Sequence, residues 1–147
     1  MVVSYYKSFK ISPGDVPLPE GIFSVRFEVA TTAGEPAFAR VGGSMPTFDL
    51  SSPAFEDGAS IPERYGYTDA NVNPPLEFDD VPAETASLAI VIDDPDAREP
   101  AGKIWDHWVV WNIEPTTSKI PEDWNASGAV QGRNDYGEQG YGGPNPP

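Results

Sequence analysis

The stretch "IVIDDPDAREPAGKIWDHWVVWNI", residues 90–113, decides the fold. Two apolar runs, the second rich in Trp and Val, flank an acidic turn that contains proline. Short runs of this kind are typical of strands, and consecutive strands usually pair. An antiparallel pair would bring Asp93, Asp94 and Asp96 close to His107, the only histidine of the chain. The pattern therefore predicts a carboxylate and an imidazole at one end of a sheet.

Residues 104–113 indicate a central strand that is covered on both faces. In a strand, Trp105, His107, Val109 and Trp111 share one face, and the opposite face is also apolar after its first residue. Seventeen prolines and fourteen glycines divide the chain into short strands and long loops. No stretch after residue 45 has a helical period. We therefore predict an all-β fold of the β-sandwich type.

The charge of the chain limits its partners. Twenty-three acidic and nine basic residues give a formal net charge of −14. Nucleic-acid binding is disfavoured, because phosphate contacts need clustered Lys and Arg. A cationic partner would explain the acidity, but we favour an acidic surface of the kind found in proteins that work in high salt. Without a secretory signal or a run long enough to span a membrane, we expect a cytoplasmic protein that is not membrane-embedded.

The charge is also distributed unevenly along the chain. Residues 1–44 contain four basic and four acidic side chains, so the whole −14 lies in residues 45–147. The change falls at "RVGGSMPTFDL", where a Gly-Gly-Ser loop signal precedes Met45. We predict a domain over residues 45–147 and an N-terminal extension over residues 1–44, with Met45 as the natural start. The run "GIFSVRFEVA" within the extension has the composition of a strand.

An aspartate beside an imidazole is compatible with several functions. The carboxylate would fix the tautomer and leave the other ring nitrogen for a ligand, or it would favour an imidazolium that binds an anion. A buried histidine satisfied by one aspartate, without a ligand, is equally compatible with these residues. One histidine and no cysteine disfavour a metal site. The chain has no "GxSxG"-like elbow for a nucleophile, and we predict no cofactor.

Four stretches in order carry a resemblance to a known family. They are "FDLSSPAFEDGASIPERYGYTDANVNPPLEF", "VPAETASLAIVIDDPDA", "WDHWVVWNI" and "GRNDYGEQGYGGPNPP". With these stretches, residues 45–147 resemble the phosphatidylethanolamine-binding protein family in its small bacterial and archaeal form, the Raf-kinase-inhibitor-like proteins. The resemblance implies a β-sandwich with Greek-key connections. It also implies a small pocket for phosphate, phosphorylated headgroups or other oxyanions, without a cofactor or established catalysis.

The resemblance also implies the pocket residues. The matching motifs are Asp-Pro-Asp-Ala, Trp-x-His and Gly-Pro-x-Pro-Pro, and they assign Asp94, Trp105, His107, Gly143, Pro144, Pro146 and Pro147 to the pocket or its rim. The family continues beyond this point with a second pocket histidine, a further strand and usually a helix. Three explanations stay open: a fragment of a longer protein, which we favour; replacement strands from residues 1–44; or a strand from a partner chain in an obligate oligomer. We expect weaker anion binding with one histidine.

The expected function is therefore that of a non-enzymatic binding protein for a small phosphorylated or oxyanion ligand. The resemblance also implies a possible role as a regulator, since some members of the family inhibit a kinase or a protease. We can name no residue of this chain that encodes such inhibition. The first alternative is a small hydrolase that uses Asp94 and His107. The second is a protein-interaction module in which the pocket is vestigial and the acidic surface binds the partner.

Overall fold

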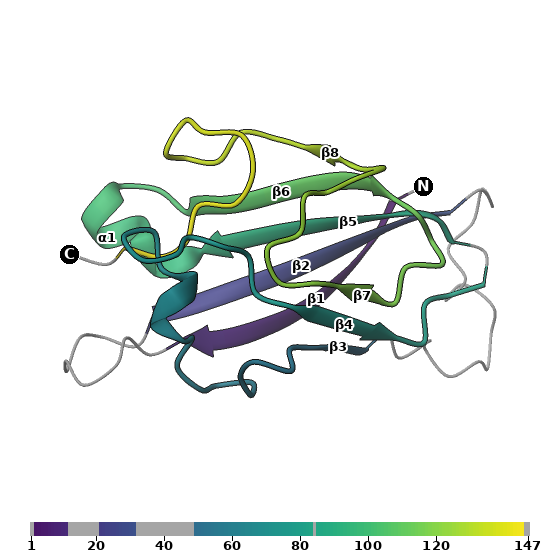
Figure 1. Cartoon of the computed structure of the whole chain (residues 1–147), viewed down its shortest axis with the longest axis horizontal. Coiled ribbons are helices and arrows are strands. Elements are labelled where there is room, and N and C mark those ends of the chain that lie inside the picture. Colours follow the sequence, from purple (N-terminus) through teal and green to yellow (C-terminus); the bar gives the residue numbers. More distant parts are fainter. Residues whose placement is uncertain (1, 12–20, 32–48, 84, 146–147) are drawn as a thin grey trace.

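The computed structural model describes residues 2–11, 21–31, 49–83 and 85–145, and in these ranges the chain forms two sheets (Figure 1). The five-stranded sheet has the order β1-β2-β5-β6-β8, with β1 Val2–Ile11, β2 Gly21–Thr31, β5 Thr85–Asp94, β6 Trp105–Ile113 and β8 Val130–Gln131. The three-stranded sheet has the order β3-β4-β7, with β3 Asp49–Ser51, β4 Leu76–Asp79 and β7 Lys119–Ile120. All neighbouring strands run antiparallel. The predicted all-β sandwich is confirmed.

The core lies between the two sheets and is built by alternate side chains of both. Phe78 of β4, Ile90 of β5 and Trp108 of β6 belong to one buried cluster. Burial of apolar area on both inner faces is what holds a sandwich together. The helical elements are short: η2 Glu63–Tyr65, η3 Pro95–Ala97 and α1 Arg98–Ala101. Among the described residues, no helix has the length and apolar character that crossing a membrane requires.

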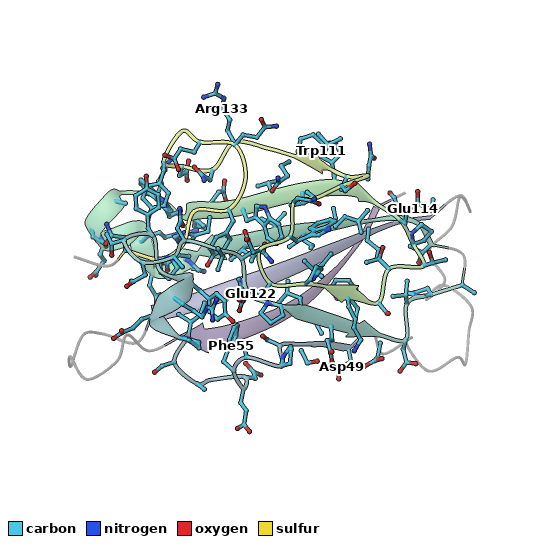
Figure 2. All side chains as sticks on the ribbon, in the orientation of Figure 1. Asp49, Phe55, Trp111, Glu114, Glu122 and Arg133 are labelled. Atoms are coloured by element: carbon cyan, nitrogen blue, oxygen red, sulfur yellow. The ribbon has the colours of Figure 1, made fainter. Side chains whose placement is uncertain are left out.

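Strand β6 is an interior strand, as predicted, because it pairs with β5 on one side and with β8 on the other. The prediction that both of its faces are covered is wrong at Trp111, which is 40% exposed (Figure 2). Two steps along β5, from Leu88 to Ile90, correspond to three steps along β6, from Ile113 to Val110. Such a bulge interrupts the alternation of side chains. It explains why Trp111 and its neighbour Asn112 are both exposed.

The N-terminal segment contributes to the larger sheet. Strand β2 contains the whole of the predicted "GIFSVRFEVA" strand and pairs with β5 from Ser24 to Thr31, on the side of β5 away from β6. Strand β1 then pairs with β2 along its whole length. Residues 2–11 and 21–31 therefore belong to the same sheet as β5 and β6, and whether they replace a strand of the family stays a prediction. Met45, Pro146 and Pro147 lie outside the described residues, so the domain boundary at residue 45 stays a prediction.

Candidate functional site

The candidate site begins where β5 ends and β6 starts. Asp94 pairs with Trp105 in the antiparallel ladder, which confirms the predicted pairing of the two strands. The Asp94 carboxylate caps η3, because its Oδ1 accepts hydrogen bonds from the backbone N–H groups of Asp96 (2.9 Å) and Ala97 (3.3 Å). Pro95 suits the first position of such a turn, where no N–H is needed. The acidic connection therefore has a fixed shape beside the start of β6.

His107 occupies a second bulge in β6. Ile92 pairs with Trp108 and Asp93 pairs with Asp106, so one step along β5 corresponds to two steps along β6. His107 is the extra residue. Bulges redirect a side chain and are common next to functional sites. The imidazole is buried, with an exposed fraction of 2% for the residue.

The ring of His107 is held by the backbone of the C-terminal loop. Its Nδ1 lies 2.6 Å from the carbonyl oxygen of Gly142, and the Gly142 N–H donates to the His107 carbonyl at 2.9 Å. Because a carbonyl only accepts, Nδ1 carries the hydrogen and Nε2 holds the lone pair in the neutral ring. The sequence interpretation gave this orienting role to an aspartate. At Nδ1 a backbone carbonyl has that role instead.

Four rings meet at this point and form what we call the aromatic cluster: Tyr67, Trp105, His107 and Tyr136. Tyr136 is at its centre. It stacks on Tyr67 with ring centroids 3.8 Å apart, meets Trp105 edge to face at 5.2 Å, and lies 6.2 Å from His107. Arrangements of this kind stabilise beyond simple burial. The cluster joins β6 to the loop after η2 and the loop after β8.

The predicted rim residues Gly143 and Pro144 lie next to the cluster. The Gly143 carbonyl accepts a hydrogen bond from the Tyr136 hydroxyl (3.0 Å), and the Pro144 carbonyl accepts one from the Tyr67 N–H (3.0 Å). The Gly143 N–H donates to Oδ1 of Asn71 at 2.8 Å. A Cβ at position 143 would overlap the backbone of Tyr65, so glycine is required there. The structure therefore brings together five of the seven predicted site residues; the other two, Pro146 and Pro147, are not described.

Burial dominates the electrostatics of the pair that the sequence singled out. It lowers the pKa of His107 and raises the pKa of Asp94, because a poorly solvated environment disfavours both charged forms. The attraction between the two groups opposes both shifts. Burial also raises the pKa of Tyr136 to about 12, so that its hydroxyl stays neutral and able to donate. The site therefore combines a half-buried acid with an imidazole that resists protonation.

Trp105 contributes a buried donor. Its indole Nε1 is buried and has no hydrogen-bond partner within the described part of the chain. Trp108, the other tryptophan nearby on β6, donates from Nε1 to Oε1 of Gln131 at 2.7 Å. An indole N–H only donates, and buried donors are almost always paired. The donor of Trp105 therefore suits an acceptor from a ligand.

One cation lies at the border of the site. The ammonium group of Lys103 is 5.2 Å from the centre of the Trp105 ring and 2.6 Å from Oδ1 of Asp135. The other oxygen of Asp135 accepts a hydrogen bond from the Asp106 N–H at 2.8 Å. These contacts fix the loop after β8 against the start of β6. The half-exposed Lys103 also provides positive charge beside Trp105.

A shallow hollow elsewhere on the protein does not belong to this site. It is lined by Ala86, Ser87, Asn112, Ile113, Glu114 and Pro115. These residues belong to the start of β5 and the end of β6, whereas the aromatic cluster lies at the opposite ends of both strands. Figure 2 labels Glu114 at this far end. Among the described residues, no group of three His, Cys, Asp or Glu side chains is placed to hold a metal ion.

Sequence reasoning missed four residues of the site: Asn71, Tyr67, Tyr136 and Gly142. All four lie in stretches that carry the family resemblance, "RYGYTDAN" and "NDYGEQGYGG". The two tyrosines are 69 positions apart, and nothing local in either stretch indicates that their rings stack. The close spacing of Tyr and Gly in both stretches was the available signal, because such segments often form packed loops.

Comparisons with known proteins show which family the chain belongs to. The family described as "Phosphatidylethanolamine-binding protein" matches residues 51–147. The chain belongs to this family. The resemblance stated from the sequence is thereby confirmed.

Individual members of the phosphatidylethanolamine-binding protein family show how far the likeness extends. A UPF0098 protein of Methanothermobacter thermautotrophicus is 44% identical over 104 residues, which cover 67% of this chain and 67% of that protein. A UPF0098 protein of Chlamydia muridarum is 42% identical over 100 residues, covering 67% and 66%. The chain thus spans about two thirds of the length of these curated relatives.

Two crystal structures of family members resemble the fold. One is a phosphatidylethanolamine-binding protein homologue of Chlamydia trachomatis, with a TM-score of 0.64 and 39% identity over 70% of this chain and 68% of that one. The other is YbcL of Escherichia coli, described as a member of the mammalian family, with a TM-score of 0.63 and 36% identity over 68% and 67%. The likeness to these two structures thus extends over about two thirds of each chain.

Proposed function

We propose that the chain is a non-enzymatic binding protein that takes a small oxyanion, such as phosphate or a phosphorylated headgroup, between Trp105 and His107. The observation that carries the proposal is the buried indole N–H of Trp105, which has no partner within the described residues. A donor in that position gains a charge-assisted hydrogen bond when an anionic oxygen enters. Membership of a binding-protein family supports the same class of function.

Asp94 has a different role in this proposal. Its Oδ1 accepts two backbone hydrogen bonds, so the carboxylate position is fixed at the edge of the site. A fixed, half-buried carboxylate would repel the phosphoryl end of a ligand and attract a cationic end. We therefore propose that an aminophosphate such as phosphoethanolamine binds with its amine toward Asp94. Inhibition of a kinase or a protease by this chain stays a prediction.

The contacts of the pair support binding over hydrolysis. A hydrolytic dyad needs the aspartate to accept from one ring nitrogen while the other nitrogen removes a proton from the nucleophile. Here Nδ1 of His107 is engaged by the Gly142 carbonyl and Oδ1 of Asp94 by two amides.

The interaction-module alternative differs from pocket binding in a measurable way. Capture of a partner by the acidic surface would weaken strongly with added salt.

The proposal is tested by NMR with phosphate and phosphoethanolamine as the probes. We expect both at millimolar concentration to shift the ring signals of His107, and phosphoethanolamine to bind more tightly. Asp94→Asn, which keeps an oxygen for the cap, should remove the preference for phosphoethanolamine while phosphate still binds. Unchanged His107 signals with both ligands would contradict the binding function. Turnover of a phosphate or carboxylate ester that disappears in His107→Gln would favour the hydrolase.

A further inference from the structure

We propose that the edge of β1 that faces away from β2 is an interaction surface for a second copy of this chain, with the two β1 strands paired antiparallel across a two-fold axis at Tyr6. Strand β1 is the last strand of the larger sheet, and within the described ranges it pairs with β2 alone (Figure 1). Alternate residues of such a strand direct their N–H and C=O groups away from the sheet. The inference does not depend on the oxyanion site.

The length and regularity of β1 suit its edge for pairing. The strand extends over ten residues, Val2–Ile11, and all of them pair with β2 without a register shift. The ladders on both sides of β5 contain such shifts. At the opposite edge of the sheet β8 has only two residues, and a short strand is one of the ways in which proteins protect an edge. An added strand can therefore continue the ladder along most of β1.

The charge of the chain limits where two copies can meet. The formal charge of −14 lies entirely in residues 45–147, whereas residues 1–44 sum to zero. Strand β1 has two lysines and no acidic residue. Two copies therefore repel each other least when they approach through this strand. Lysines on an edge strand discourage pairing if they come to lie opposite each other, so the register of the pair matters.

Symmetry restricts this register. Two identical strands that pair across a two-fold axis use the same edge, so a residue that directs its N–H and C=O outward must lie opposite another that does so. These directions alternate along a strand, and the axis therefore passes beside a residue and not between two. Axes at Tyr6 and at Lys7 give the longest ladders, over residues 2–10 and 3–11.

The residue types favour the axis at Tyr6. An axis at Lys7 puts the two Lys7 residues directly opposite each other, and like charges in that position destabilise a ladder. An axis at Tyr6 places no lysine opposite a lysine. The opposed pairs are then Val2 with Lys10, Val3 with Phe9, Ser4 with Ser8, Tyr5 with Lys7, and Tyr6 with itself. Because aromatic pairs and pairs of an aromatic with a β-branched residue stabilise a ladder, the strand is complementary to itself, which favours a second copy over an unrelated partner.

Sedimentation equilibrium of the native protein tests the association. We expect a monomer–dimer equilibrium whose dissociation constant falls about tenfold between about 0.1 M and about 2 M KCl, because salt screens the repulsion between the acidic parts of the two copies. A contact between β1 and an acidic surface of another copy would respond in the opposite direction, since it would depend on attraction between unlike charges.

A single cysteine tests the register, because the chain contains none of its own. In Tyr6→Cys the two thiols meet at the axis with their Cα atoms about 5 Å apart, within the range of a disulfide. Ser8→Cys is the matched control: it lies on the same face of the strand, but its two copies are about 14 Å apart along the ladder. Mild oxidation should produce a covalent dimer of Tyr6→Cys and leave Ser8→Cys monomeric in denaturing gels.

Each outcome supports or overturns the proposal. A native protein that stays monomeric at every salt and protein concentration overturns it, and so does a dimer that dissociates as salt is added. Equal cross-linking of Tyr6→Cys and Ser8→Cys, or cross-linking of neither in a protein that dimerises, indicates a different contact and also overturns it. If Tyr6→Cys does not fold, a mixture of Val3→Cys and Phe9→Cys replaces it, because these two positions lie opposite each other and should form a mixed disulfide.

Discussion

His107 and Gly142 hold each other by two hydrogen bonds, from ring Nδ1 to the Gly142 carbonyl (2.6 Å) and from the Gly142 N–H to the His107 carbonyl (2.9 Å). The two residues are 35 positions apart. The single histidine of the chain therefore has a structural contact through Nδ1. The first prediction follows from the cost of charging this ring.

We expect stability to fall as the pH drops through the range in which a free histidine titrates. Burial lowers the pKa of His107 in the folded protein, whereas an unfolded histidine titrates at about 6.5. The unfolded chain therefore binds the proton more readily. The stabilising contribution is complete above the unfolded pKa and is lost as the pH falls below it. Urea unfolding at pH 7.5 and 5.5 measures the difference.

His107→Asn is the matched control for this experiment. It keeps a donor for the Gly142 carbonyl and removes the only histidine, so the pH dependence in this range should flatten. Ten millimolar phosphate should restore part of the stability of the native protein at pH 5.5, because anion binding favours the charged ring. An equal pH dependence in the native protein and the variant would contradict the assignment to His107.

The second prediction concerns the close approach of Gly143 to the loop after η2. A Cβ at this position overlaps backbone atoms of Tyr65 and Gly66. Backbone atoms cannot relieve such an overlap by changing rotamer, as a side chain can. Gly143→Ala should therefore destabilise the protein by about 3 kcal/mol in urea unfolding. Gly58→Ala is the control: a Cβ there meets nothing within 4 Å, and its φ of +82° adds a cost of about 1 kcal/mol. Equal effects of both substitutions would refute the packing of the loop.

The third prediction tests whether residues 1–44 are part of the folded sheet. Arg26 lies in the interior of β2, paired with Tyr6 of β1 and Val91 of β5. Arg26→Pro removes a backbone N–H from the ladder and should lower the free energy of unfolding by at least about 1 kcal/mol. Arg26→Thr keeps the N–H and a strand-compatible side chain, so it should have little effect. If the proline variant unfolds like the native protein, residues 1–44 are an appended segment.

Local patterns were sufficient to predict the framework of the site. The apolar runs on either side of "DDPDAREPAGK" predicted β5 and β6, and the rule that consecutive strands pair placed Asp94 beside Trp105. The family resemblance then assigned Trp105, His107, Gly143 and Pro144 to one region, and the described contacts bring them together. All of these inferences rest on residues close in sequence or on motifs matched as units.

Features that depend on distant or irregular contacts were not predictable in this way. The bulges at His107 and near Asn112 change the alternation of buried and exposed side chains in β6. No residue type in that strand predicts a bulge. Exposure of Trp111 follows from the second bulge and was therefore missed. The Gly142 carbonyl was missed as a partner of His107 because a backbone acceptor has no sequence signature.

The most direct test of the account follows the indole N–H signals during a titration with phosphate, in protein labelled with ¹⁵N. Four tryptophans give four signals, and Trp105→Phe assigns the one that matters. We expect the signal of Trp105 to move as its Nε1–H gains an anionic acceptor. The signal of Trp108, already bonded to Gln131, should stay in place. A Trp105 signal that is unchanged at saturating phosphate would contradict the proposed site.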